Sequence, residues 1–212
     1  MASYIPEAYE SLPSLREAAN LFKETQAKEL LLGPIRELFL DSGIHEQYGV
    51  SLLHKHFPIE TNQRLVDCRN ISTPWTVENS NNSVVSKYEG FIIPRTFRFF
   101  NGILAPFEFD FSPCSSHGDP DRELFDRISA LLHQHGLENV LGVRSLDRYD
   151  PDLSVEITEG KTNIMIPRGS VKDSELIEAL WVFSADDDQR CHCREYCWKD
   201  TKGKHLNDHG CS

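Results

Sequence analysis

Hydrophobic residues recur at helical spacing in the first 41 residues of the chain. The residues that repeat at intervals of three and four are Leu15, Ala18, Ala19 and Phe22. Ser14 and Glu17 form a capping box at the start of this pattern. Gly33-Pro34 interrupts it before it resumes. We therefore expect residues 14–41 to form a helical hairpin or a kinked long helix.

Alternating hydrophobic and polar residues predict strands in the middle of the chain. The clearest alternation is the run from Phe107 to Phe111, which suits a strand with one buried face. Asn101-Gly102, just before it, is a strong hairpin-turn signal. Seven of the twelve phenylalanines lie between Phe91 and Phe111. We therefore place this hairpin at the centre of the core.

A helix and further strands are expected in the second half of the chain. A hydrophobic stripe predicts a helix that begins near Pro120 and ends at Gly136. The expected strands are residues 140–143, 153–157 and 163–166, while residues 176–183 fit either a strand or a helix. This order predicts an α+β fold for residues 1–185, with N-terminal helices packed on a largely antiparallel sheet and one further helix. An acidic linker then leads into a Cys/His-rich tail, residues 186–212.

Charge and hydropathy exclude several classes of partner. The net charge of −11 argues against binding to nucleic acid, which requires clustered Lys and Arg to neutralise phosphates. It argues equally against a polybasic membrane patch. No stretch approaches the roughly 20 apolar residues that span a bilayer. The first residues also lack the basic and apolar regions of a secretory signal. We expect a soluble cytoplasmic protein, with the nucleus as the alternative location.

The tail carries the densest cluster of metal ligands in the chain. Cys193 and Cys197 are separated by three residues, as are His205 and His209. Zinc sites use such pairs of soft and borderline donors, so these four residues form a candidate zinc site. The donors that could substitute for one of the four are Cys191, His192 and Cys211. The alternatives are disulfide or redox chemistry and a disordered polar tail.

A second group of candidate ligands follows the first predicted helices. On a strand, His54 and His56 would point to the same side, and Glu60 would return to it. Two imidazoles and a carboxylate form the ligand set of many non-haem iron sites. The spacing resembles the first metal motif of the cupins, but the glycine after the glutamate and a second motif are missing. We therefore favour a structural role for this histidine pair.

These patterns support two hypotheses about function. The leading one is an intracellular, non-catalytic protein whose C-terminal structural zinc site organises a surface for an unknown protein partner or small molecule. The alternative is a metal-dependent enzyme, of hydrolase or oxygenase type, that uses His54, His56 and a carboxylate. A third arrangement would join the two, with Cys191, His192 or Cys193 packed beside His45 or His54.

The run from Gly43 to Phe57, together with the Cys/His-rich end, resembles a family of uncharacterised proteins from filamentous fungi. That family has no established activity. The resemblance implies a fungal source and assigns no catalytic residue to this chain.

Overall fold

The structure is a computed structural model that describes residues 4–77, 90–113, 122–146, 154–185 and 191–198. The helices are α1 (Pro6–Glu10), α2 (Leu15–Glu24), α3 (Ala27–Leu30), α4 (Arg36–Asp41) and α5 (Arg122–Gln134), with a π-helical turn at Leu31–Ile35 and a 3₁₀ turn at Asp173–Glu175. The strands are β1 (Tyr48–Leu52), β2 (Gln63–Cys68), β3 (Ile71–Thr76), β4 (Phe91–Phe100), β5 (Ile103–Ser112), β6 (Leu141–Ser145), β7 (Val155–Glu159), β8 (Thr162–Ile166), β9 (Leu176–Phe183) and β10 (Cys191–Trp198).

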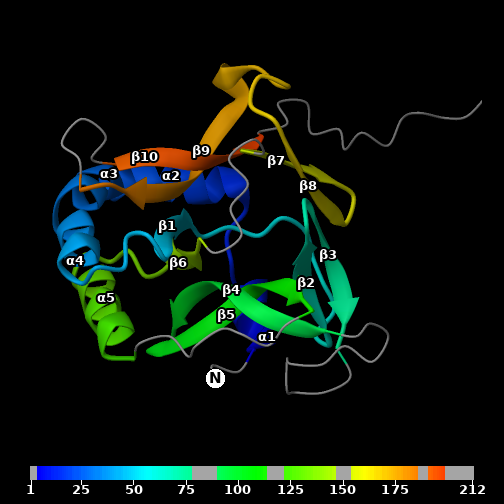
Figure 1. Ribbon diagram of the computed structural model, residues 1–212, viewed down its shortest axis with the longest axis horizontal. Coiled ribbons are helices and arrows are strands. Elements are labelled where there is room, and N and C mark those ends of the chain that lie inside the picture. The colour runs from blue at the N-terminus through cyan, green and yellow to red at the C-terminus, as the bar shows by residue number, and fades with distance from the viewer. Residues whose placement is uncertain (1–3, 78–89, 114–121, 147–153, 186–190, 199–212) are drawn as a thin grey trace, which may run out of the picture.

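The strands form one closed barrel. Their order around it is β1-β6-β4-β5-β2-β3-β8-β7-β10-β9, and β9 pairs with β1 to close the ring. Among the described strands, β2 with β5 and β7 with β10 pair in parallel, and the other neighbours are antiparallel. Figure 1 shows most of the helices gathered at one side of the barrel.

The prediction of an α+β fold with helices on an open sheet is wrong, because the sheet closes on itself and the helices are short. Strands β2 and β3 were not predicted, because Pro74 and short polar runs weaken their strand pattern. Residues 176–183, which fitted either a strand or a helix, form β9. Residues 191–198, which we placed in the tail, are the barrel strand β10. Closure depends on the pairing of strands far apart in sequence, which no local pattern reports.

The N-terminal helices follow the sequence closely. Ser14 and Glu17 form the expected capping box, and the helix kinks at Gly33, where the backbone leaves helical geometry. The helices cover the outside of β1, β6 and β9. Phe22 of α2 stacks on Trp181 of β9 with ring centroids 4.8 Å apart. The predicted interruption at Gly33-Pro34 is confirmed. The helical region also breaks at Gln26, whose φ is 54°, so residues 14–41 form several short helices whose hydrophobic faces pack on the barrel wall.

The central hairpin is also confirmed. Asn101 and Gly102 both have positive φ angles, 51° and 74°, as a tight two-residue turn between β4 and β5 requires. The phenylalanines that the sequence placed in the core are buried, namely Phe97, Phe107 and Phe109. The pairing of β4 with β5 shifts register around Arg95, which is a β-bulge. Such a bulge re-aims side chains, and here consecutive Arg95 and Thr96 both contact acidic side chains of β5.

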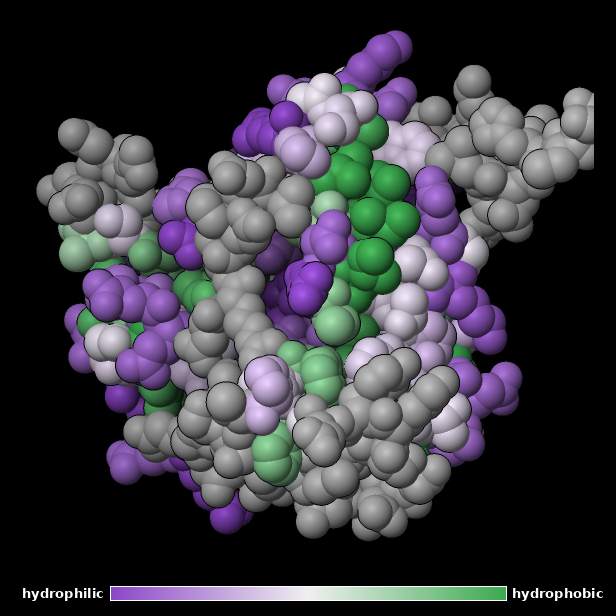
Figure 2. Space-filling model, turned by 45° about the vertical axis from the view of Figure 1, so that its right-hand side comes forward, coloured by the Kyte–Doolittle hydropathy of each residue, from purple (hydrophilic) through white to green (hydrophobic). Residues whose placement is uncertain are grey.

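The surface view shows a strip of hydrophobic residues bordered by hydrophilic ones on one face of the molecule (Figure 2). The large hydrophobic side chains that stand out most from the described surface are Leu32, Ile71 and Ile103. Within the described part of the chain, no helix combines the length and the hydrophobicity that crossing a bilayer requires.

Candidate metal centre

The two histidines singled out by the sequence lie just beyond the end of β1. Backbone hydrogen bonds hold this segment on both sides of His54: the Leu53 amide donates to Val140 O at 2.9 Å, and the Lys55 amide donates to Pro13 O at 2.7 Å. The Lys55 side chain turns the other way and donates to Glu10 O. His54 and His56 therefore share one side of the segment, and their ring centroids are 4.5 Å apart.

A carboxylate from another strand of the barrel completes a group of candidate ligands. Glu156 lies on β7, and its Oε1 is 3.1 Å from His56 Nδ1. One ligand atom each of His54, His56 and Glu156 lie within 4.8 Å of one another. All three side chains are buried. All three donors thus face one small volume of the barrel interior.

Each imidazole is oriented by a partner on its outer nitrogen. His54 Nδ1 lies 2.9 Å from the carbonyl oxygen of Leu52, which can only accept, so Nδ1 carries the hydrogen and Nε2 keeps a free lone pair. His56 Nε2 lies 3.3 Å from Glu108 Oε1, and Thr96 Oγ1 donates to the other oxygen of Glu108. Histidine ligands of metals characteristically have such an outer carbonyl or carboxylate partner.

The burial of these groups changes their protonation. Burial and then the charge of His56 lower the pKa of His54 to about 3, so His54 is neutral. Burial alone would lower the pKa of His56, but Glu156 and Glu108 outweigh it and raise that pKa. Burial also raises the pKa of Glu156, with a further contribution from the charge on Glu108. Without a metal, a protonated His56 therefore holds the two carboxylates together.

Further charged side chains extend this network across the barrel. Arg144 Nη1 lies 2.9 Å from Glu195 Oε2, and Arg95 Nη1 lies 3.2 Å from Asp67 Oδ2 and 3.4 Å from Asp110 Oδ1. Together with Glu108 and Glu156, the described network has five buried carboxylates and two guanidinium groups. Even with His56 protonated, the acidic side chains of this network outnumber its cationic ones.

The structure separates the other predicted ligands. Glu60 is exposed and is not part of the group, because the chain bends at His56 and Phe57 and ends the alternation that would have returned it. Cys191 and Cys193 pack against the hydrophobic cluster that the helices form with β1, β6 and β9, here called the outer core. The donors His205, His209 and Cys211 lie outside the described residues.

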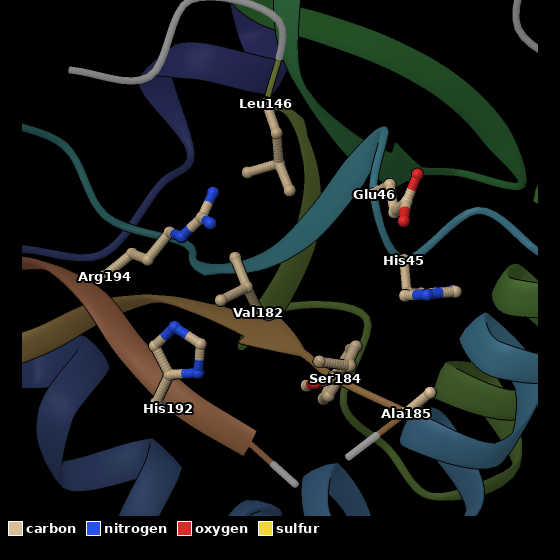
Figure 3. Close-up of a pocket in the computed structure, with 9 residues that line it drawn as sticks. His45, Glu46, Leu146, Val182, Ser184, Ala185, His192 and Arg194 are labelled. Carbon is tan, nitrogen blue, oxygen red and sulfur yellow. The ribbon is translucent and has the colours of Figure 1, made fainter. Parts of the chain in front are cut away.

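His45 and His192 line a surface pocket of about 420 Å³. Neither His54 nor His56 lines this pocket. His192 and Arg194 of β10 lie on one side of Val182, and His45 and Glu46 lie on the other (Figure 3). The ring of His45 points away from His192 (Figure 3). The pocket thus brings these two histidines near one another without making their rings converge.

The acidic members of the centre are the residues that the sequence analysis missed. Glu108 and Glu156 lie within predicted strands, each flanked by hydrophobic residues. We took the hydrophobic face of such strands as the buried one. In this barrel Phe107 and Phe109 pack in hydrophobic clusters, while Glu108 between them contacts His56. The sequence signal that could have identified these buried acids was a carboxylate between two large hydrophobic residues of a predicted strand.

The neutral state of His54 predicts a specific dependence of stability on pH. Because its pKa falls from about 6.5 in the unfolded chain to about 3 in the folded one, its contribution is complete above pH 6.5 and is lost as the pH falls toward 3. The unfolding free energy of metal-free protein should therefore fall less between pH 7 and pH 5 in His54→Asn than in wild type, as measured by urea titration. The variant keeps a donor for Leu52 O. The control is the exposed variant His135→Asn. If the unfolding free energy of His54→Asn falls with pH as steeply as that of wild type and of His135→Asn, the assignment of a neutral, buried His54 is contradicted.

Comparison of the chain with protein-family models, curated proteins and solved structures finds no match. The arrangement of His54, His56 and Glu156 is the observation from which a function can be argued.

Proposed function

We propose that this protein binds one divalent transition-metal ion of the zinc class inside its barrel, through His54, His56 and Glu156. The observation that carries the proposal is the convergence of their three ligand atoms within 4.8 Å. Imidazole nitrogen and carboxylate oxygen are ligands that zinc accepts at about 2.0–2.2 Å. A divalent ion that replaced the His56 proton would offset one of the negative charges that the buried network leaves in excess.

The outer contacts support a metal centre more than a simple ion-pair network. In a simple ion-pair network, each buried polar atom needs a partner, but the histidine nitrogens need not all point toward one common centre. Here the ring nitrogens divide their roles: Nδ1 of His54 and Nε2 of His56 contact Leu52 O and Glu108, while the opposite nitrogens face the centre. A bound ion would replace the Nδ1 proton of His56, which now holds Glu156.

Zinc binding to the full chain tests the proposal. After removal of metal and reduction of the thiols, isothermal titration should give about one tight site per chain. Changing His54 or His56 to Ala should abolish that site, whereas the exposed histidine variant His133→Ala should keep it. Circular dichroism of each variant separates loss of ligand from loss of fold. Tight binding that persists in folded His54→Ala/His56→Ala protein would contradict the proposal.

A catalytic use of the same centre is a second candidate. Arg144 favours it: burial by itself raises the pKa of Glu108, but the hydrogen bond from His56 and then the charge of buried Arg144 lower it, so this guanidinium acts on the carboxylate that contacts a candidate ligand. Two histidines and one carboxylate also leave coordination positions at which water or a substrate can bind. If the centre is catalytic, azide should change the visible spectrum of the cobalt-substituted protein. A spectrum that azide leaves unchanged would indicate a closed, structural centre.

A further inference from the structure

The thiol of Cys197 faces the same centre from the last strand of the barrel. Its Sγ lies 3.4 Å from His54 Nε2, the nitrogen that keeps its lone pair, and 3.6 Å from Glu156 Oε1. A third distance between candidate donors, from Glu156 Oε1 to His56 Nδ1, is 3.1 Å. Bonds of about 2.0–2.3 Å at tetrahedral angles place neighbouring donors about 3.3–3.7 Å apart. Two of the three observed separations fall in that range, and the third is 0.2 Å shorter than its lower limit.

We propose that the Cys197 thiolate is the fourth ligand of the metal centre, so that the ion fastens strand β10 to the barrel. This inference rests on the proposed metal site and extends it. Four protein ligands close the coordination sphere, as in structural zinc sites, and a thiolate among them favours zinc over harder cations. The thiol releases its proton to solvent when the ion binds.

The position of Cys197 in the sheet gives the bond a mechanical consequence. Strand β10 lies beside β7 (Figure 1) and pairs with it in parallel. The described pairs along this seam are Tyr196 with Val155 and Cys197 with Glu156. One of these two pairs thus consists of two proposed ligands, one from each strand of the seam. An ion held by both residues would cross-link β7 and β10 at this point.

The strand geometry also distinguishes this site from one built with Cys193. The pairing of β10 with β9 shifts register on both sides of Glu195. As a result, Cys193 packs against the outer core while Cys197 contacts His54 and Glu156 in the interior. Cys193→Ser is therefore the matched control: it removes a partly buried thiol from the same strand without removing a proposed ligand.

Cobalt(II) substitution of the full-length, reduced protein tests the proposal, because a cobalt–thiolate bond adds an intense near-ultraviolet charge-transfer band. We expect this band in wild type, in Cys193→Ser and in the double variant His205→Ala/His209→Ala. In Cys197→Ser the band should disappear, while cobalt still binds to His54, His56 and Glu156 with an affinity lower on the order of tenfold or more. Hydrogen exchange of the β10 amides should slow on metal binding in wild type and much less in Cys197→Ser.

Each other outcome has a distinct meaning. A band that persists in Cys197→Ser, or that disappears in Cys193→Ser, overturns the assignment of Cys197. A further outcome is that cobalt binds to wild type without the band and fails to bind to the His54 and His56 variants. That result overturns the assignment of Cys197 as fourth ligand and leaves the proposed function in place. Absence of cobalt and zinc binding to wild type overturns both.

Discussion

Replacing His56 with leucine is expected to lower the unfolding free energy of the metal-free protein by about 3–5 kcal/mol. His56 lies between two buried carboxylates, 3.3 Å from Glu108 Oε1 and 3.1 Å from Glu156 Oε1, and its own side chain is only 4% exposed. Leucine would leave both acidic groups without their shared cation in an interior that water reaches poorly. Urea unfolding with a chelator present, followed by tryptophan fluorescence, measures the loss.

The control for this variant is a histidine–glutamate pair at the surface. His133 Nδ1 lies 3.0 Å from Glu138 Oε1, but the His133 side chain is 80% exposed. His133→Leu should therefore cost no more than about 1 kcal/mol. If His56→Leu does not fold, His56→Leu/Glu156→Gln should recover part of the stability, because it removes one of the two unpaired charges. A loss for His56→Leu as small as that for His133→Leu would show that the carboxylates do not depend on His56.

Replacing Arg95 with methionine should have a comparable effect, again about 3–5 kcal/mol. The bulge in β4 directs this guanidinium to Asp67 and Asp110, and Asp67 also accepts a hydrogen bond from Ser72 Oγ. Burial by itself lowers the pKa of Arg95, but the charges of Asp110 and Asp67 more than reverse that effect. Methionine keeps much of the side-chain volume and removes only the charge and its hydrogen bonds, so urea unfolding would report chiefly the lost ion pairs.

The matched control is Arg168→Met at the surface. Arg168 Nε is 3.7 Å from Asp173 Oδ1, with both side chains more than half exposed, so about 0–1 kcal/mol is expected. Arg95→Lys should fall between the two, because lysine restores the charge without the planar fork that reaches two carboxylates. Equal stabilities of Arg95→Met and Arg168→Met would refute a supporting role for the internal cluster.

The sequence was most informative where structure depends on neighbours in the chain. The capping box at Ser14, the kink at Gly33 and the turn at Asn101-Gly102 each follow from a few adjacent residues, and all three are present. The proximity of His54 and His56 belongs to the same class, since a spacing of two places both rings on one side of an extended segment.

Features that depend on distant strands were not predictable in the same way. Closure of the barrel pairs β1 with β9, more than 120 residues later, and no local pattern reports that pairing. The ligand group likewise combines residues from both ends of the chain, with Glu156 and Cys197 carried to the histidines by β7 and β10. Local spacing suggested Glu60 instead, because it is the nearest carboxylate in sequence rather than in space.

Diffraction from crystals of the zinc-loaded protein, with data collected on both sides of the zinc absorption edge, tests the central claim most directly. The account predicts one anomalous peak in the barrel interior, about 2.0–2.2 Å from His54 Nε2, His56 Nδ1 and a Glu156 oxygen. A peak elsewhere on the chain, with the His56 ring still bonded to both Glu108 and Glu156, would contradict it.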